Sequence, residues 1–354
     1  MSRFFSNKYA SLVPYTPGEQ PKQMQYIKLN TNESPFAPSQ KAQDMANEAA
    51  KSLQLYSDPE CRALNEAMAK HFGVDTDEIL MTNGSDEILN FAFMAYCDEK
   101  TPAAFADITY GFYSVFAEIN RVPYRVIPLN EDFSINVEDY MGIGCTIFIA
   151  NPNAPTGIAL PISEIEKIIQ SNPDNIVVVD EAYVDFGAES CVPLIRKYNN
   201  LLVTQTFSKS RSMAGARLGF GIGCRELIAD LNTIKYSTNP YNVNSMTAAA
   251  GIGAISDEEY TQKNCKTIIE NREFTSYELK KLGFEMTDSK TNFIFAQSDQ
   301  IDGGELYRKL KERGILVRHF DKAAISNYNR ITVGTREQMQ ALIDTVKNIL
   351  EEKQ

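Results

Sequence analysis

Short apolar runs alternate with amphipathic segments over most of the chain. Runs such as CTIFIAN (145–151), NIVVVDEAY (175–183) and LLVTQTF (201–207) are typical of strands buried on both faces. Segments such as SDEILNFAFMAYC (85–97) and PISEIEKIIQ (161–170) repeat apolar residues every three or four positions, which indicates helices. Strands separated by helices favour right-handed crossovers. The pattern therefore predicts an α/β fold with a large, doubly wound, mainly parallel sheet.

The pattern changes toward both ends of the chain. Residues 1–40 are rich in Pro, Asn and Ser and predict an extended arm that packs with a small domain. Residues 41–245 carry the alternation of strands and helices and form the predicted large domain. Beyond them, a long helical stretch precedes two short strands, TNFIFAQ and NRITVGT, and a closing helix. We therefore expect residues 246–354 to form a smaller α+β domain.

Composition and charge narrow the class of ligand. The 354 residues include 46 Asp and Glu against 35 Lys and Arg, a net charge of -11, which argues against nucleic-acid binding. Six scattered cysteines without a CxxC pair and only two histidines favour neither a metal centre nor a disulfide framework. The N-terminus lacks an apolar signal core, and no run approaches the roughly 20 apolar residues of a membrane span. We predict a cytoplasmic protein that acts on small molecules, without a metal.

Chemistry is expected at the carboxyl ends of the strands, where ligands collect in an open parallel sheet. Lys209 follows one apolar strand among hydroxyl side chains, with Arg217 eight positions later. This lysine suits a Schiff base beside a bound anion, although a solvated loop lysine is the commoner case. Asp180 ends another strand 29 residues earlier, so the two side chains can lie at neighbouring strand ends. Three roles stay open for its carboxylate: it binds a cationic ligand, it caps a helix, or it forms a structural salt bridge.

Weaker signals lie at other strand ends. Ser85 and Asp86 follow a glycine and open a helix, where they bind a phosphate or only cap the helix. Tyr110 either covers a flat heterocycle or packs in the core. Asn153, in the turn NPNAPTG, either presents its amide to a ligand or closes the turn. An amine, a carboxylate, an anion site and an aromatic face together are what pyridoxal 5'-phosphate (PLP) requires, and the combination predicts this cofactor.

These motifs, in this order, resemble the fold-type I PLP-dependent aminotransferases and, among them, the histidinol-phosphate aminotransferases. The likeness extends over nearly the whole chain, through KLNTNESPFAPS, LYSDPE, TNGSDEIL, DITYGFYSVF, NPNAPTG, VVVDEAY, TFSKSRSMAGARLGFGIG and NRITVGTRE. The resemblance implies a homodimeric transaminase of histidine biosynthesis. Such an enzyme exchanges an amino group between L-histidinol phosphate and 2-oxoglutarate (glutamate) by a ping-pong Schiff-base mechanism.

The resemblance also implies a role for individual residues. Lys209 would carry the cofactor and move the Cα proton, Asp180 would keep the pyridine nitrogen protonated, and Tyr183 would hydrogen-bond the phenolic oxygen. Further cofactor contacts would come from Ser85, Asp86, Tyr110, Asn153, Ser208, Arg217 and, across the dimer interface, Tyr56. Substrate contacts would come from Tyr15, Asn32, Arg318 and Arg330.

One position departs from the family pattern. The family commonly has NPNNPTG, in which the asparagine before PTG hydrogen-bonds the cofactor's phenolic oxygen, and this chain has Ala154 there. Either Asn153 or a water replaces that donor, or Tyr183 serves alone. Because an ionised oxygen with fewer donors holds the neighbouring Schiff-base proton more tightly, we expect a raised pKa for the bound cofactor.

Three other functions stay open at this point. An aromatic amino acid aminotransferase and a phosphothreonine decarboxylase share this scaffold, and the bond broken at Cα depends on the substrate's pose, which no motif fixes. A non-catalytic sensor that only binds PLP would need a DNA-binding or partner domain. Residues 1–40 are too short and insufficiently basic to supply a recognition helix.

Overall fold

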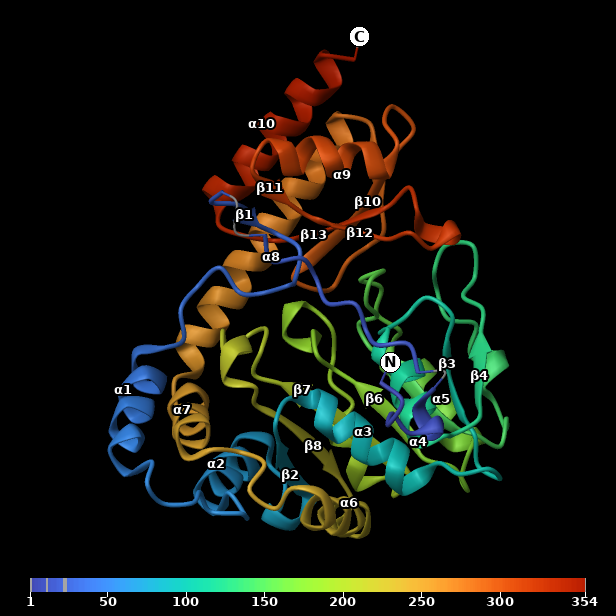
Figure 1. The fold of residues 1–354 in the computed structure, drawn as a ribbon, viewed down its shortest axis with the longest axis vertical. Coiled ribbons are helices and arrows are strands. Elements are labelled where there is room, and N and C mark those ends of the chain that lie inside the picture. Colours follow the sequence, from blue (N-terminus) through green and yellow to red (C-terminus); the bar gives the residue numbers. More distant parts are fainter. Residues whose placement is uncertain (1, 11, 22–23, 354) are drawn as a thin grey trace.

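The computed structural model describes residues 2–10, 12–21 and 24–353, and it contains a large and a small sheet (Figure 1). The large sheet has seven strands in the order β2-β8-β7-β6-β5-β3-β4. Its strands are β2 (Ile79–Thr82), β3 (Ala103–Ala106), β4 (Tyr124–Ile127), β5 (Thr146–Ala150), β6 (Val177–Asp180), β7 (Leu201–Thr206) and β8 (Gly219–Gly223). Only β8 is antiparallel to its neighbours, β2 and β7. The predicted α/β fold with a mainly parallel sheet is confirmed.

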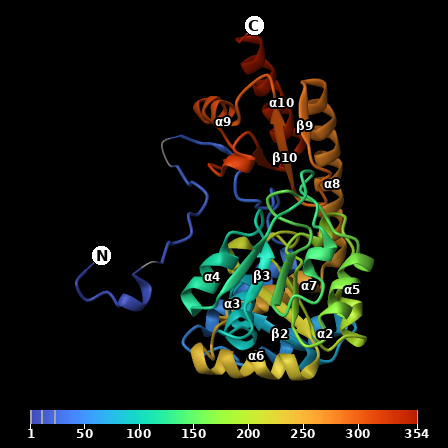
Figure 2. The same cartoon turned by 90° about the vertical axis from the view of Figure 1, so that its right-hand side faces the viewer.

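Helices cover both faces of this sheet because its strands are buried on both sides. One face packs against α1 (Gln40–Ala49), α2 (Arg62–Phe72), α5 (Ile162–Ser171) and α7 (Ser245–Ile255), and the other against α3 (Ser85–Tyr96), α4 (Phe112–Asn120) and α6 (Arg225–Thr238). Figure 2 shows the two layers on either side of the strands. Along β6, Val177 and Val179 enter one core, and Val178 enters the other.

The small sheet is antiparallel, with four strands in the order β12-β13-β10-β9. Its strands are β9 (Phe284–Met286), β10 (Phe293–Ser298), β12 (Arg318–His319) and β13 (Asn329–Thr332), and the helices near it are α8 (Glu258–Lys281), α9 (Gly303–Glu312) and α10 (Arg336–Glu351). In Figure 1, α8 runs from the large-sheet region up to the small one. Apolar side chains of all three helices share a core with β10 and β13.

The N-terminal segment lies partly along the small sheet region. Its strand β1 (Ile27–Lys28) pairs in parallel with β11 (Ile315–Leu316), and Tyr15, earlier in the chain, packs on Phe112 of α4 with 4.2 Å between the ring centres. The predicted domain boundaries at residues 40 and 245 stay predictions, and α7, just past the second one, packs against α1 and α2. Within the described ranges, no helix combines the length and apolar character of a membrane span.

Short 3-10 helices occupy many of the connections. They are η1 (Asn7–Tyr9), η2 (Ala50–Ser52), η3 (Thr76–Glu78), η4 (Val137–Tyr140), η5 (Val184–Phe186), η6 (Val192–Arg196), η7 (Ala214–Ala216) and η8 (Ala323–Ile325). Two connections follow strand ends of the large sheet directly. Asp180 is the last residue of β6 and leads to η5, and Lys209 lies just beyond β7. The strand ends therefore deliver polar side chains to one edge of the sheet.

Candidate active site

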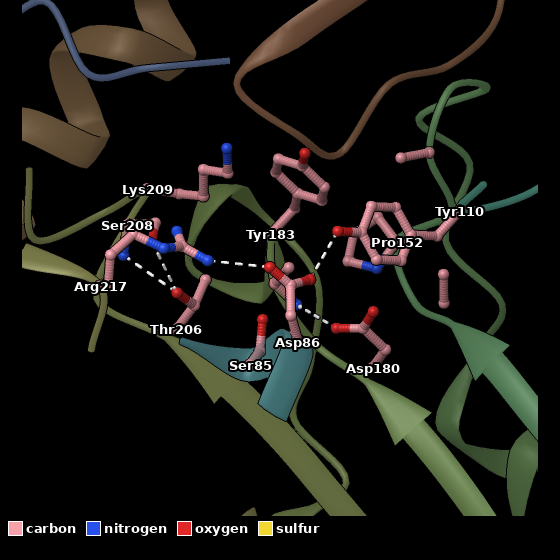
Figure 3. A pocket seen from close by; sticks show the side chains of 13 residues that line it. Ser85, Asp86, Tyr110, Pro152, Asp180, Tyr183, Thr206, Ser208, Lys209 and Arg217 are labelled. Atoms are coloured by element: carbon pink, nitrogen blue, oxygen red, sulfur yellow. Dashed lines mark hydrogen bonds and ion pairs between the residues drawn. The ribbon is translucent and has the colours of Figure 1, made fainter. Parts of the chain in front are cut away.

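A pocket of about 100 Å³ opens at the carboxyl edge of the large sheet (Figure 3). The predicted residues that line it are Ser85, Asp86, Tyr110, Asp180, Tyr183, Ser208, Lys209 and Arg217. They come from the ends of β6 and β7, from the start of α3, from the segment before α4 and, for Arg217, from the segment just before β8. The fold thus brings residues that are more than 100 positions apart in the sequence to one place.

A second cavity, of about 560 Å³, adjoins the first on the side of the small sheet. Tyr110, Tyr183 and Lys209 line both cavities. The predicted substrate residues Tyr15, Asn32, Arg318 and Arg330 all line this second cavity. The two cavities therefore form one site, with the lysine at their junction.

Lys209 is held loosely at this junction. Its Nζ atom lies 3.3 Å from the carbonyl oxygen of Thr31 and 5.7 Å from the centre of the Tyr183 ring. No carboxylate in the described part of the chain forms an ion pair with it. An amine with so few fixed partners is free to form a covalent bond with a carbonyl ligand.

Asp180 lies deep in the pocket, at the end of β6. Its Oδ2 atom accepts a hydrogen bond from the Tyr113 hydroxyl at 3.1 Å, and its Oδ1 atom accepts one from the Ala182 amide at 3.3 Å. Burial raises the pKa of Asp180 to about 7. No lysine or arginine of the described residues forms a salt bridge with it. The carboxylate therefore has unused capacity for a cationic partner.

The opposite wall suits an anion. The amino end of α3 begins at Ser85, and Arg217 approaches it with Nη2 2.8 Å from Oδ2 of Asp86. The Tyr110 hydroxyl donates to the other oxygen of Asp86 at 2.6 Å. Gly84, with φ 79°, permits this approach, because a Cβ there would lie 2.6 Å from Nη2 of Arg217. Free backbone amides at the start of a helix, together with a nearby guanidinium group, form a typical phosphate site.

Tyr183 and the hydroxyl residues complete the walls. The Tyr183 oxygen accepts a hydrogen bond from Nδ2 of Asn32 at 2.9 Å, which leaves its own proton free to be donated into the pocket. The Thr206 hydroxyl lies 3.0 Å from that of Ser208. Both hydroxyls line the pocket beside Lys209.

The Asn153 side chain points away from the pocket. Its Nδ2 atom donates to the carbonyl of Ile108 and to the hydroxyl of Thr156, both at 2.9 Å, and its Oδ1 atom accepts from Thr109 at 2.7 Å. Ala154 lines both cavities instead. Asn153 therefore closes the turn, and it is not among the residues that line either cavity.

Two arginines dominate the second cavity. Arg330 donates from Nη2 to the carbonyl of Asn30 at 3.0 Å, and its Nε atom has no partner among the described residues. Burial lowers the pKa of this guanidinium. Arg318 reaches the carbonyl of Thr16 at 3.4 Å. Because carbonyls neutralise neither charge, both guanidinium groups are available to an anionic ligand.

Tyr56 lies outside both cavities. It is 85% exposed and stacks on Tyr241 at 4.7 Å between ring centres. Leu53 and Leu55, just before Tyr56 in the chain, are also exposed. Several large apolar side chains exposed within a few residues of one another are typical of a protein interface.

Several contributors escaped the sequence analysis. The Tyr113 hydroxyl holds Asp180, and the Thr31 carbonyl contacts Lys209. The signal for Tyr113 was its spacing, since it follows Tyr110 by three positions and one turn of chain brings the two rings together, edge to face at 5.6 Å. Lys322 also lines the second cavity and donates to the carbonyl of Asp107 at 2.6 Å.

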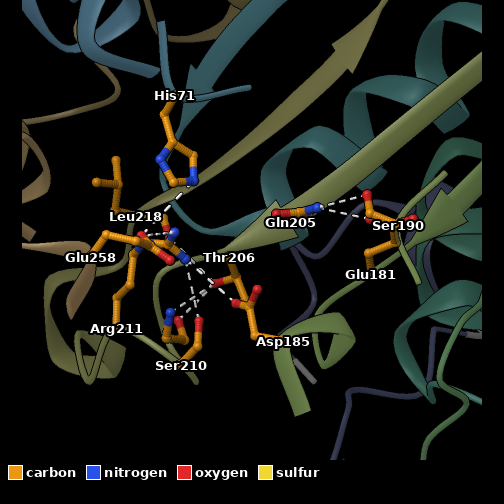
Figure 4. A network of polar contacts seen from close by, with 11 residues as sticks. His71, Glu181, Asp185, Ser190, Gln205, Thr206, Ser210, Arg211, Leu218 and Glu258 are labelled. Carbon is orange, nitrogen blue, oxygen red and sulfur yellow. Dashed lines mark hydrogen bonds and ion pairs between the residues drawn. The ribbon is translucent and has the colours of Figure 1, made fainter. Parts of the chain in front are cut away.

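A network of polar side chains lies behind the lysine loop (Figure 4), and we name it the rear network. Its members are His71, Glu181, Asp185, Ser190, Gln205, Arg211 and Glu258. Arg211, with a buried side chain, pairs with Asp185 and Glu258 at 3.4 Å each. Asp185 follows the pocket residue Tyr183 closely, and Glu258 begins α8. The rear network therefore joins the lysine loop to two other elements.

In the described ranges no group of His, Cys, Asp and Glu side chains is arranged to hold a metal ion. The pocket instead combines an amine, a buried carboxylate, an anion site and the Tyr110 ring.

Comparisons with known proteins agree with the family resemblance that the motifs indicate. The sequence model of the family described as "Aminotransferase class I and II" matches residues 24–346. The chain is 49% identical, over 353 residues, to "Histidinol-phosphate aminotransferase" of Marinomonas sp., covering 99% of this chain and 100% of that protein.

Solved structures give the same result for the fold. A putative histidinol-phosphate aminotransferase from Erwinia carotovora atroseptica superposes with a TM-score of 0.85 at 27% identity, covering 92% of this chain and 96% of that one. Histidinol-phosphate aminotransferase from Sinorhizobium meliloti, in complex with pyridoxal-5'-phosphate, has a TM-score of 0.84 at 21% identity, covering 93% and 92%. The family resemblance inferred from the motifs is confirmed.

Proposed function

Because this chain belongs to the class I and II aminotransferase family, we propose that it is a PLP-dependent transaminase acting on L-histidinol phosphate and 2-oxoglutarate. The observation that carries the proposal is the convergence of Lys209, Asp180 and Arg217 on one pocket. The full-length identity to a relative named for this activity supports the choice of substrate.

The residues of the pocket fit PLP. Asp180, buried without a cationic partner among the described residues, suits a protonated pyridine nitrogen. Arg217, Ser208 and the amides at the start of α3 suit the phosphate. Tyr110 offers a ring face, and Tyr183 offers a hydroxyl proton to the phenolic oxygen. Asn153, whose amide is fully used within the protein, is not part of this proposal.

When bound, PLP supplies an electrophilic aldehyde carbon and a ring that accepts electrons from the substrate's Cα. Lys209 would hold the aldehyde carbon through Nζ and would move the proton from the substrate's Cα. Asp180 would keep the ring nitrogen protonated, which would favour the flow of electrons away from Cα.

One site must accept both a phosphate and a carboxylate. Arg330 and Arg318 line the cavity beside Lys209, and the planar guanidinium pairs with either anion. We propose that they bind the distal phosphate of histidinol phosphate and the carboxylates of 2-oxoglutarate in turn. Tyr15 and Asn32 border the same cavity and complete the contact with the substrate.

We also propose a cytoplasmic homodimer in which Tyr56 reaches the neighbour's phosphate site. Tyr56 is exposed and stacked on Tyr241, beside the apolar side chains of Leu53 and Leu55, which a partner subunit would cover. Mixing inactive Lys209→Ala and Tyr56→Ala subunits tests this, because one site of each mixed dimer regains both residues. We expect recovery of up to about one quarter of wild-type activity. No recovery on subunit exchange would contradict the shared site.

A single-turnover spectrum tests the substrate pair. The PLP-loaded protein is mixed with L-histidinol phosphate and then with 2-oxoglutarate. We expect the visible absorbance of the bound cofactor to fall and then to return. Bleaching by phenylalanine or tyrosine but not by histidinol phosphate would establish the aromatic aminotransferase, and release of carbon dioxide from phosphothreonine would establish the decarboxylase.

A further inference from the structure

We propose that Tyr113 is a positioning residue that holds the Asp180 carboxylate ionised and correctly oriented toward the ring nitrogen of PLP. The inference rests on the cofactor assigned in the proposed function. Asp180 has one donor on each oxygen, the Tyr113 hydroxyl at 3.1 Å and the Ala182 amide at 3.3 Å. Two donors on two oxygens fix the plane of the carboxylate.

The Tyr113 hydroxyl is the only side-chain donor to Asp180 in the described part of the chain. Asp180 is 5% exposed, so water can replace little of this contact. A hydrogen bond donated to a buried carboxylate favours its ionised form, and it opposes the desolvation that raises the pKa of Asp180. Loss of this single hydroxyl would therefore disfavour the charge that a protonated ring nitrogen needs.

Aromatic packing fixes the position of this hydroxyl. Tyr113 is fully buried on α4, and its ring centre lies 5.7 Å from that of Phe105 and 5.8 Å from that of Phe148. The Tyr110 ring meets it edge to face, at 5.6 Å and 85°. Rings in this arrangement leave little room to move. The phenol is thus a preorganised donor.

Tyr110 and Tyr113 belong to one turn of chain that reaches both walls of the pocket. The Tyr113 amide donates to the Tyr110 carbonyl at 3.2 Å. Tyr110 donates its hydroxyl to Asp86, which pairs with Arg217 at the phosphate wall, whereas Tyr113 donates to Asp180. Removing only the Tyr113 oxygen therefore alters the wall of the ring nitrogen and leaves the phosphate wall in place.

The test is the substitution Tyr113→Phe, with Tyr140→Phe as its matched control. Tyr140 is also buried, at 1% exposure, but its hydroxyl has no hydrogen-bond partner among the described residues. PLP is titrated into the cofactor-free proteins between about pH 6 and 9, a range chosen around the pKa of Asp180. We expect Tyr113→Phe to weaken PLP binding about tenfold or more, as for hydrogen bonds to charged groups, and Tyr140→Phe less than twofold.

The pH dependence has a defined sign. Without the Tyr113 hydroxyl the pKa of Asp180 rises, so Asp180 ionises at a higher pH. The pH at which PLP binding reaches half of its plateau should therefore move upward in Tyr113→Phe and stay in place in Tyr140→Phe. A purely structural role of Tyr113 would lower stability without moving this midpoint.

A double-mutant cycle with Asp180→Asn completes the test. If Tyr113 acts through the carboxylate, Tyr113→Phe should change PLP affinity less than about twofold in the Asp180→Asn background. An equal loss in both backgrounds, or wild-type affinity with an unmoved midpoint in Tyr113→Phe, would overturn the proposal. Urea unfolding of each cofactor-free variant identifies loss of the fold. Failure of the wild-type protein to bind PLP would overturn the cofactor assignment instead.

Discussion

Asp180 and Glu181 are neighbours in the chain, yet they serve different regions of the molecule. Asp180 faces the pocket, whereas Glu181 belongs to the rear network (Figure 4). Burial raises the pKa of each carboxyl group to about 7. Glu181 accepts hydrogen bonds from Ser190 at 2.6 Å, from the Cys191 amide at 2.5 Å and from Gln205 at 2.8 Å.

The two carboxylates differ in their hydrogen-bond donors and not in their burial. The protein itself satisfies Glu181, whereas Asp180 keeps capacity for a ligand. A perturbed pKa alone therefore does not separate a functional carboxylate from a structural one. The unfilled hydrogen-bonding capacity, together with the pocket, makes the distinction.

The largest expected effect concerns the lysine loop. Lys209→Ala removes the amine that we propose both bonds PLP and acts as the base, so we expect kcat to fall by on the order of 10⁴ or more. Arg211→Lys, two positions away in the rear network, keeps its positive charge and lies outside both cavities, so it should lower kcat far less than Lys209→Ala does. Steady-state kinetics of the PLP-loaded proteins measure both. Comparable losses in the two variants would end the functional distinction between the regions.

Amide substitutions at the two neighbouring carboxylates test the comparison directly. Asp180→Asn removes the charge opposite the ring nitrogen, and we expect kcat/KM to fall by on the order of 10² to 10³. Glu181→Gln should stay within about threefold of wild type, because its oxygen can keep the Cys191 amide while Ser190 and Gln205 reorient to accept from its amide nitrogen. Full activity of Asp180→Asn would contradict the role of this carboxylate.

The pH dependence of stability gives a smaller effect. For Glu181 the folded pKa, about 7, lies above the usual value of 4.5, so the folded protein retains a proton that the unfolded chain loses. The free energy of unfolding should therefore fall as pH rises from about 4.5 to about 7, by on the order of 3 kcal/mol for this group. Glu181→Gln should flatten the fall in cofactor-free protein. Urea unfolding at several pH values measures it, and an unchanged slope would count against the assignment.

The smallest effect is expected at Ala154. Ala154→Asn should add a donor near the phenolic oxygen of PLP, which favours the ionised oxygen and lowers the pKa of the bound cofactor by about one unit or less. A pH titration of the cofactor's visible absorbance compares the variant with wild type. A wild-type pKa equal to or below that of Ala154→Asn would contradict the prediction.

Strands with continuous apolar residues could be predicted because the apolar run itself indicates that the strand is buried. The strand β8 was not, since its sequence GFGIG holds three glycines. The packing of α3 explains two of them: a Cβ on Gly219 would lie 2.2 Å from the Ser85 nitrogen, and one on Gly221 would lie 2.9 Å from Ile88. Such a requirement depends on a distant helix and leaves no periodic pattern.

The candidate site shows the same limit. Lys209 and Asp180 could be placed because each follows an apolar strand, and strand ends share one edge of the sheet. The direction in which a side chain of a turn points could not be predicted from the sequence, as Asn153 shows. Its amide is turned inward by Thr109 and Ile108, which belong to the segment after another strand. The role of Tyr113 likewise depends on a contact between α4 and β6.

The long helix α8 has a mechanical consequence. Its 24 residues form a rod of about 36 Å at the usual rise per residue. Glu258 fastens its first turn to the lysine loop through Arg211, and Arg272 further along binds the carbonyls of Phe186 and Thr291. Arg272 thus ties η5, which follows β6 of the large sheet, to the segment before β10 of the small sheet. Side chains of this one helix therefore connect the lysine loop with segments beside both sheets.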